Sequence, residues 1–158
     1  MNIVLDTNVL VAGLLSPFGA CGEIVLMVSS GEITLSFDAR ILAEYDEVLR
    51  RPKFHFEDEK VTALLDYIVH RGQTVASSPL VNSLPDPDDE TFLAIAVASQ
   101  AACLVTGNQG HFPAELCQGI TIYSPREFLN FYKKQKKEKK RITLIRRSTR
   151  TRKKPRAG

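Results

Sequence analysis

The sequence predicts an α/β fold in which helices flank a mainly parallel central sheet. Short apolar runs, which are too brief for buried helices, alternate along the chain with longer segments whose apolar residues recur with a helical period. Turn-forming residues, chiefly Gly, Pro, Asn and Asp, separate these segments. The chain has 158 residues, of which 44% are hydrophobic and 25% charged, so it matches one globular domain with at most a short appendage.

The amino-terminal part begins with the apolar run Asn2–Leu5, which we expect to be a buried strand that ends at Asp6. Apolar residues continue to Leu15, where a Ser-Pro-Phe-Gly sequence breaks the run. The next elements are expected over Glu23–Ser30 (a helix) and Ile33–Ser36 (a strand).

The middle of the chain contains an apolar stripe and an acidic helix start. Apolar residues recur with helical spacing between Ile41 and Leu49, and Arg51-Pro52 ends this helix. Three successive acids then open the following helix, because negative charges complement the positive end of a helix dipole. These acids are Glu57, Asp58 and Glu59, and a short strand is expected after the helix, over Gln73–Ala76.

The carboxyl-terminal half opens with an acidic turn, Pro85–Glu90, in which two prolines restrict the backbone ahead of a helix. The last helix begins at a predicted capping box, with Ser124 as N-cap, Pro125 at the first helical position and Glu127 completing the box. The elements between these two features are expected over Asp89–Ala101 (a helix), Cys103–Thr106 (a strand) and Ile120–Tyr123 (a strand).

Charge is distributed very unevenly along the chain. Residues 133–158 contain 14 Lys or Arg and one acid, a net charge of +13, whereas the first 132 residues contain 7 Lys or Arg and 17 acids, a net charge of −10. We therefore expect an acidic domain over residues 1–132 and a basic, disordered extension over residues 133–158. Lys133–Lys140 is a candidate for prolonging the last helix, although it offers little apolar surface for packing.

Other features concern the environment of the protein. No apolar run approaches the roughly 18 residues that span a bilayer, and the first residues lack the basic and apolar segments of a signal peptide. The three cysteines are odd in number and show no C-x-x-C spacing, which argues against a disulfide framework or a cysteine-based zinc site. We therefore expect a cytoplasmic protein without a membrane segment.

Three sets of acids are candidates for a functional site: Asp6 after the first strand, Glu44 beside the apolar stripe, and the turn from Asp86 to Glu90. Each has a structural interpretation, namely a helix cap, a solvated side chain and helix-dipole charges, respectively. Ligands of parallel sheets bind beyond the carboxyl ends of the strands, where Asp6 and Asn108 are both expected. Carboxylates gathered there repel one another unless a cation compensates, and oxygen ligands favour Mg²⁺ or Mn²⁺.

Short motifs occur in one order along residues 1–132. They are MNIVLDTNVL at residues 1–10, LLSP at 14–17, ILAEYDEVLRRPKF at 41–54, DPDDETFLA at 86–94, LVTGN at 104–108, HFP at 111–113 and SPREFL at 124–129. In this combination, the chain resembles the PIN-domain ribonucleases, and in particular the branch of toxins from toxin–antitoxin systems that are relatives of VapC-like toxins.

The resemblance implies a Rossmann-like, three-layer α/β/α sandwich and a ribonuclease that depends on Mg²⁺ or Mn²⁺. By their position in the motifs, Asp6, Glu44 and Asp89 match the catalytic acids. Asn108 stands where many relatives have Asp, and its amide can ligate a cation without supplying charge. The third acid stays open, with Asp86, Asp88 and Glu90 as alternatives to Asp89. The implied metal ligands are Asp6, Glu44, Asp86, Asp89 and Asn108, and the implied supporting residues are Asn8, Thr106 and Glu90.

The expected function is therefore an endoribonuclease that forms the toxin half of a toxin–antitoxin pair. The resemblance further implies a homodimer and a small antitoxin protein that blocks the acidic pocket. A non-catalytic RNA-binding or interaction module on the same fold is the main alternative, which Asn108 and the basic extension favour. A small-molecule phosphatase is disfavoured because no Gly-rich phosphate loop is present.

We interpret His111, next to Gly110, as a loop-packing residue rather than a general base.

The basic extension suits a polyanion, and RNA is the expected partner. An extension that folds back onto the acidic body is the competing interpretation. The residues expected to bind RNA are Lys133, Lys134, Lys136 and Lys137.

Overall fold

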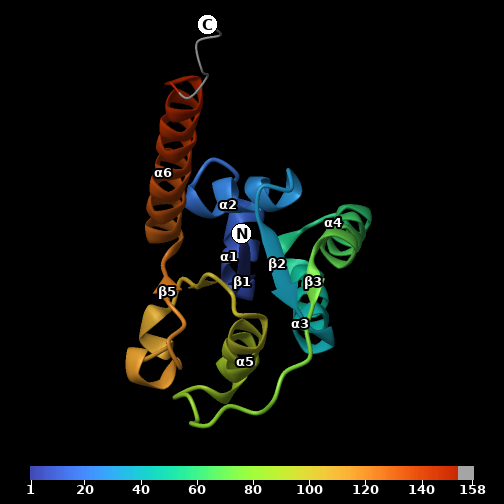
Figure 1. Ribbon diagram of the computed structural model, residues 1–158. Coiled ribbons are helices and arrows are strands. Elements are labelled where there is room, and N and C mark those ends of the chain that lie inside the picture. The colour runs from blue at the N-terminus through green and yellow to red at the C-terminus, as the bar shows by residue number, and fades with distance from the viewer. Residues whose placement is uncertain (153–158) are drawn as a thin grey trace, which may run out of the picture.

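The computed structural model describes residues 1–152 (Figure 1). Its five strands form one parallel sheet in the order β3-β2-β1-β4-β5, and helices flank this sheet. The α/β fold and the parallel sheet that the sequence predicts are thereby confirmed. The strands are β1 (Asn2–Leu5), β2 (Thr34–Phe37), β3 (Gln73–Thr74), β4 (Leu104–Val105) and β5 (Ile122–Tyr123).

The helices connect the strands and pack against the sheet and against one another. α5 contacts the central strands β1 and β2, whereas α6 packs against α2. Short 3-10 turns at Pro52–Phe54, Pro87–Asp89, Gln109–His111 and Ala114–Leu116 complete the connections. The α-helices are α1 (Thr7–Leu15), α2 (Ala20–Ser29), α3 (Ala39–Leu49), α4 (Asp58–Arg71), α5 (Glu90–Ser99) and α6 (Pro125–Arg152).

The predicted elements are present, with shifted ends. α1 already begins at Thr7, directly after Asp6, and α2 begins at Ala20 rather than at Glu23. The strands β3, β4 and β5 pair over two residues each, which is shorter than predicted. An apolar run marks where a strand is buried, but the length of its ladder depends on the partner strand, which the run alone does not reveal.

β1 lies at the centre of the sheet, and its apolar residues are fully buried. A wholly apolar strand of this kind is typical of a parallel sheet that is covered on both faces. Leu5 of β1 is in register with Val105 of β4. The two strands therefore end side by side, and the residues that follow them, Asp6 and Thr106, come together at the carboxyl edge of the sheet.

The corner between α1 and α2 depends on two glycines. A Cβ on Gly22 would overlap the backbone carbonyl of Pro17, and one on Gly13 would lie 2.5 Å from Val25 Cγ2 and 2.6 Å from the carbonyl oxygen of Cys21. The two helices can approach so closely only without these side chains.

In residues 1–152, none of the helices taken singly has the length and apolar character of a membrane span. The helices α1 and α2, which are bent by 100° relative to each other, reach the length and composition of such a span only when they are taken together.

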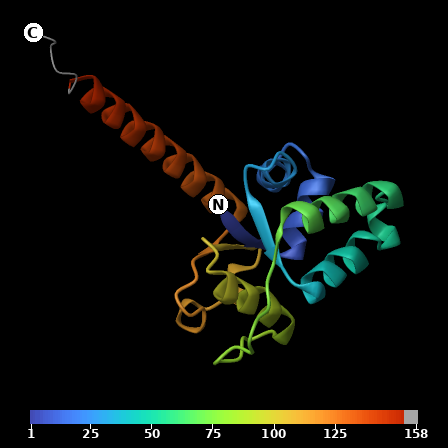
Figure 2. The ribbon, with the colours of Figure 1, turned by 45° about the vertical axis from the view of Figure 1, so that its right-hand side comes forward.

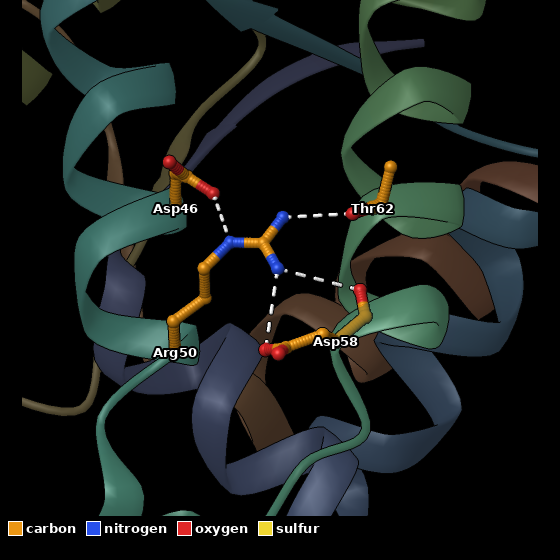
Figure 3. A network of polar contacts seen from close by, with 4 residues as sticks. All are labelled: Asp46, Arg50, Asp58 and Thr62. Atoms are coloured by element: carbon orange, nitrogen blue, oxygen red, sulfur yellow. Dashed lines mark hydrogen bonds and ion pairs between the residues drawn. The ribbon is translucent and has the colours of Figure 1, made fainter.

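Arg50, directly after α3, ties that helix to α4 (Figure 3). Its guanidinium donates to Asp46 of α3 at 2.6 Å, and to Asp58 at 3.4 Å and Thr62 at 2.8 Å on α4. Exposed contacts of this kind contribute little to stability, but they restrict the relative orientation of the two helices. The network therefore helps to place α3, the helix that carries Glu44.

The last helix, α6, is the main correction to the sequence-based expectation. It runs without interruption from Pro125 to Arg152, so the disorder expected from residue 133 onward is wrong as far as residue 152. Residues 153–158 of that extension lie outside the described residues. Lys, Arg, Gln and Glu lose little side-chain freedom in a helix, which gives this segment helix propensity without an apolar face. The predicted capping box is confirmed, because the backbone N of Glu127 donates to Ser124 Oγ and that of Ser124 donates to Glu127 Oε2.

Candidate functional site

Asp6 lies directly after β1 at the carboxyl edge of the sheet and is 7% exposed. The fully buried hydroxyl of Thr106, directly after β4, donates a hydrogen bond of 2.7 Å to Asp6 Oδ2. This contact joins residues 100 positions apart, and the parallel pairing of β1 with β4 creates it. Asp6 is thus a nearly buried carboxylate with one oxygen held by a neighbouring strand.

Glu44 reaches the same edge from α3. The hydroxyl of Thr7, the first residue of α1, donates a hydrogen bond to Glu44 Oε2. The buried hydroxyl of Tyr45 donates to the carbonyl oxygen of Leu5, the last residue of β1, at 2.5 Å. These two contacts hold α3 against the end of β1. Glu44 is therefore half-buried near Asp6. It is not the solvated surface side chain that was the structural alternative to a functional role.

The acidic turn before α5 divides into two groups. Asp89 Oδ2 lies 3.0 Å from His111 Nδ1, and the Asp89 side chain is 13% exposed. One carboxylate oxygen each from Asp86 and Asp89 and one ring nitrogen of His111 lie within 4.8 Å of one another, close enough for one cation to contact all three. Glu90 is engaged elsewhere, since its Oε1 accepts a hydrogen bond of 3.0 Å from the backbone N of Leu84. Compared with Glu90, this geometry favours Asp89 and Asp86 as the third acid. Asp88 is exposed, and its charge raises the pKa of Glu44.

The acids at this edge influence one another electrostatically. Burial raises the pKa of Asp6, and the hydrogen bond from Thr106 opposes that rise. Burial also raises the pKa values of Glu44 and Asp89, and the negative charge of Asp6 raises both further. Ionisation of all three carboxylates at neutral pH therefore costs free energy. A divalent cation among them would offset that cost.

Two asparagines, Asn8 in the first turn of α1 and Asn108 in the loop after β4, make hydrogen bonds close to Asp6. The side-chain oxygen of the exposed Asn8 accepts a hydrogen bond of 3.5 Å from the backbone N of Gly107. The backbone N of Asn108 donates to Thr106 Oγ1 at 3.0 Å, so Thr106 accepts one hydrogen bond and donates another to Asp6. The structure thus brings Asn8, Thr106 and Asn108 to the edge of the sheet that holds Asp6.

The lysines expected to bind RNA lie away from these acids. Lys133 Nζ is 3.5 Å from Glu23, and Lys136 Nζ is 3.6 Å from Glu32. Glu23 belongs to α2 and Glu32 lies between α2 and β2, so this part of α6 packs along α2 and not at the carboxyl edge. The other two lysines of the expected set, Lys134 and Lys137, are exposed on the same helix.

His111 and Thr7 are residues of this site that sequence reasoning did not select, and His111 is the one with a contact to the acidic turn. It follows β4 in a 3-10 turn and contacts Asp89, 22 positions earlier in the chain. A histidine beside Gly110 carries no local signal for such a contact. The HFP motif marks the position, but only the fold shows that the imidazole meets the acidic turn.

Residues 2–110 match a family model described as PIN domain. The fold is similar to a chain in the crystal structure of VapBC2 from Rickettsia felis bound to a promoter DNA fragment, with 16% sequence identity, a TM-score of 0.49, and coverage of 78% of this chain and 98% of that chain. A chain in the structure of FitAB bound to the IR36 DNA fragment is also similar, with 17% identity, a TM-score of 0.49, and coverage of 79% and 95%. Among curated proteins, no sequence matches this chain.

Proposed function

We propose that this chain, which belongs to the PIN domain family, is a metal-dependent endoribonuclease that hydrolyses phosphodiester bonds in RNA. The observation that carries the proposal is the convergence of Asp6, Glu44 and Asp89 from three separate parts of the chain. Carboxylates with raised pKa values at one edge of a sheet are more typical of functional sites than of a solvated surface. The motif resemblance to PIN-domain ribonucleases supports the same activity.

The donor atoms at this edge fit a hard divalent cation, Mg²⁺ or Mn²⁺. Carboxylate and amide oxygens are the ligands that both ions prefer. The imidazole of His111 beside Asp89 is a ligand that Mn²⁺ accepts more readily than Mg²⁺. A bound cation of this kind neutralises charge on the phosphodiester and makes water a better nucleophile. The proposed ligands are Asp6, Glu44, Asp86, Asp89 and Asn108.

Hydroxyl groups of the protein position two of the proposed catalytic acids. Thr106 orients Asp6, and Thr7 orients Glu44. Carboxylates that are held before a ligand arrives need little reorganisation when charge develops on the substrate. In this proposal Thr106, Asn8 and Glu90 have supporting roles, and Glu90 acts by holding the loop before the acidic turn.

Cleavage of a panel of structured and single-stranded RNAs tests the proposal. The purified protein is incubated with the panel in EDTA, in Mg²⁺ and in Mn²⁺, beside Asp6→Asn and a matched control, Asp66→Asn. The control removes the same charge from an exposed position of α4. We expect cleavage that requires a cation, that falls at least about a hundredfold in Asp6→Asn, and that persists in Asp66→Asn.

Thermal unfolding adds a measurement that does not depend on activity. Mg²⁺ or Mn²⁺ is expected to raise the Tm of the wild type and of Asp66→Asn, but not that of Asp6→Asn, because a ligand that binds only the folded state stabilises it. Cation stabilisation without cleavage of any RNA would favour the non-catalytic RNA-binding module. Absence of both effects in a folded protein would contradict the metal-dependent activity itself.

We propose further that the protein is a toxin of a toxin–antitoxin system, a cytoplasmic homodimer whose acidic edge is blocked by a small antitoxin protein. The motif resemblance to VapC-like toxins supports this part of the proposal. Induced expression in a bacterial host tests it: the wild type is expected to arrest growth and Asp6→Asn is not. Normal growth in the presence of active wild-type protein would contradict toxicity, and a monomer in sedimentation would contradict the homodimer.

A further inference from the structure

The carboxyl-terminal part of α6 projects beyond the rest of the molecule (Figures 1 and 2). Tyr132 donates a hydrogen bond of 3.2 Å to Glu32, and Lys136 Nζ lies 3.6 Å from the same carboxylate. Glu32 lies just ahead of β2, so it marks the amino edge of the parallel sheet. Residues 137–152, which we call the arm, therefore extend past the amino edge and away from the carboxyl edge that holds Asp6.

The arm carries many cations. Eight of its residues are Lys or Arg and one is acidic, a net charge of +7, and all of its residues are exposed. Among the described residues, the ion pairs of α6 involve Lys133 and Lys136, which lie before the arm. At 1.5 Å per residue, the arm spans about 24 Å. This is a dense row of positive charge over a length that matches several nucleotides.

The apolar residues of the arm do not favour a second protein chain. Ile142, Leu144 and Ile145 are 51%, 65% and 54% exposed. Residues two positions apart point in nearly opposite directions around a helix, so Leu144 and Ile142 do not share a face. These residues therefore lack the continuous seam that pairs one helix with another. The arm also leads away from its own acidic body, which is contrary to an extension that folds back.

Positive charge does form a continuous face on the arm. Lys139, Lys140, Arg146, Arg147 and Arg150 are related by spacings of three, four and seven residues, which place them on one side of the helix. Such a row of Lys and Arg suits a regular series of phosphates, since binding releases the counterions of the nucleic acid.

We propose that the arm binds the phosphate backbone of RNA, through this basic face and without reading the bases. The proposal rests on the proposed function, which makes RNA the substrate. Because the arm and Asp6 lie at opposite edges of the sheet, the arm holds RNA outside the cleavage site. The residues that contact RNA are then mainly those of the arm, and not Lys133 and Lys136, which pair with α2 and its following loop.

The test compares RNA binding by two full-length variants of equal charge, each in an Asp6→Asn background and in EDTA, so that no cleavage occurs. Affinity for an unstructured RNA of about 40 nucleotides is measured between about 50 and 200 mM salt. Gln replaces each cation because it retains helix propensity, and circular dichroism checks that the helix is kept. The arm variant combines Lys140→Gln, Arg146→Gln, Arg147→Gln and Arg150→Gln, and the control combines Lys53→Gln, Lys60→Gln, Arg71→Gln and Arg126→Gln.

We expect the slope of log affinity against log salt to fall by up to about 3 in the arm variant, since each lost phosphate contact contributes about 0.7. Its affinity at about 0.1 M salt should fall at least about tenfold, and that of the control variant should fall much less. The proposal would be overturned if the salt slope of the arm variant were unchanged or if both variants lost RNA affinity equally. It would also be overturned if the arm variant lost affinity only for duplex DNA of the same length. Sedimentation that shows the arm variant dissociating a dimer while RNA binding is retained would overturn it as well. Because binding is measured without cleavage, failure of the arm proposal is distinguishable from failure of the nuclease proposal.

Discussion

Asp6, whose carboxylate accepts a hydrogen bond from Thr106, is the most buried acid at the carboxyl edge of the sheet. A carboxylate that is 7% exposed is costly to ionise, and the hydrogen bonds that it accepts from the Thr106 hydroxyl and from the backbone at Thr7 and Asn8 offset only part of that cost. Neighbouring Glu44 and Asp89 add repulsion, because the charge of Asp6 raises the pKa values of both. The site is therefore a local source of instability that a cation can relieve.

Asp6→Asn is expected to stabilise the protein in EDTA at neutral pH. Burial raises the pKa of Asp6 above its ordinary value of 3.8, so this group contributes stability below that pH and loses the contribution as the pH rises through the raised pKa. The variant lacks the ionised, repelled form, and its gain at pH 7 should be on the order of 1 kcal/mol.

Urea denaturation at several pH values measures this effect. The gain should shrink as the pH falls and vanish below 3.8, where Asp6 is protonated in both the folded and the unfolded wild type. The exposed control Asp66→Asn should change stability little at any of these pH values. A loss of stability in Asp6→Asn at pH 7 would show that the ionised carboxylate supports the fold.

Among the elements, the corner between α1 and α2 is the most sensitive to side-chain size. Gly22→Ala places a methyl group against the backbone of Pro17, which cannot move as a flexible side chain can. We expect a loss of about 1–3 kcal/mol in the free energy of unfolding, the usual range for overpacking.

Gly110→Ala is the matched control for this corner, because a Cβ there would meet nothing within 4 Å. Its effect on stability should stay within about 0.5 kcal/mol. Urea denaturation of both variants checks the prediction. Equal stabilities would mean that the α1–α2 corner relaxes without cost.

Across the whole molecule, the basic arm and the proposed catalytic acids lie apart. The acids lie at the carboxyl edge of the sheet, and the arm of α6 extends past the amino edge. An RNA that contacts both must pass around the body of the protein. If the arm binds RNA as proposed, its electrostatic attraction raises the local concentration of long RNA without altering the site itself.

This arrangement predicts that the effect of the arm depends on RNA length. When Asp6 is retained, the arm variant should cleave RNAs of a few nucleotides as fast as the wild type. For long RNAs, its KM should rise about tenfold with little change in kcat. Steady-state kinetics on a series of RNA lengths measures this. A fall in kcat on short RNAs would show that the arm substitutions disturb the carboxyl edge.

Local sequence was sufficient for features that depend on neighbouring residues. The apolar run before Asp6 predicts a buried strand, the stripe from Ile41 to Leu49 predicts α3, and the capping box at Ser124 predicts the start of α6. The expectation of disorder from residue 133 onward was wrong up to Arg152. It gave more weight to the missing apolar face than to the helix propensity of Lys and Arg.

The amino-acid sequence is enough to predict the α/β class, the parallel sheet, the motif resemblance and the set of acids from which the site is drawn. The fold is needed to show which residue each acid contacts: Thr106 for Asp6, Thr7 for Glu44, and His111 for Asp89. It also directed α6 away from the acids. Both outcomes follow from strand order, since hydrogen bonds between strands far apart in the sequence determine which loops share an edge, and no local pattern encodes that pairing.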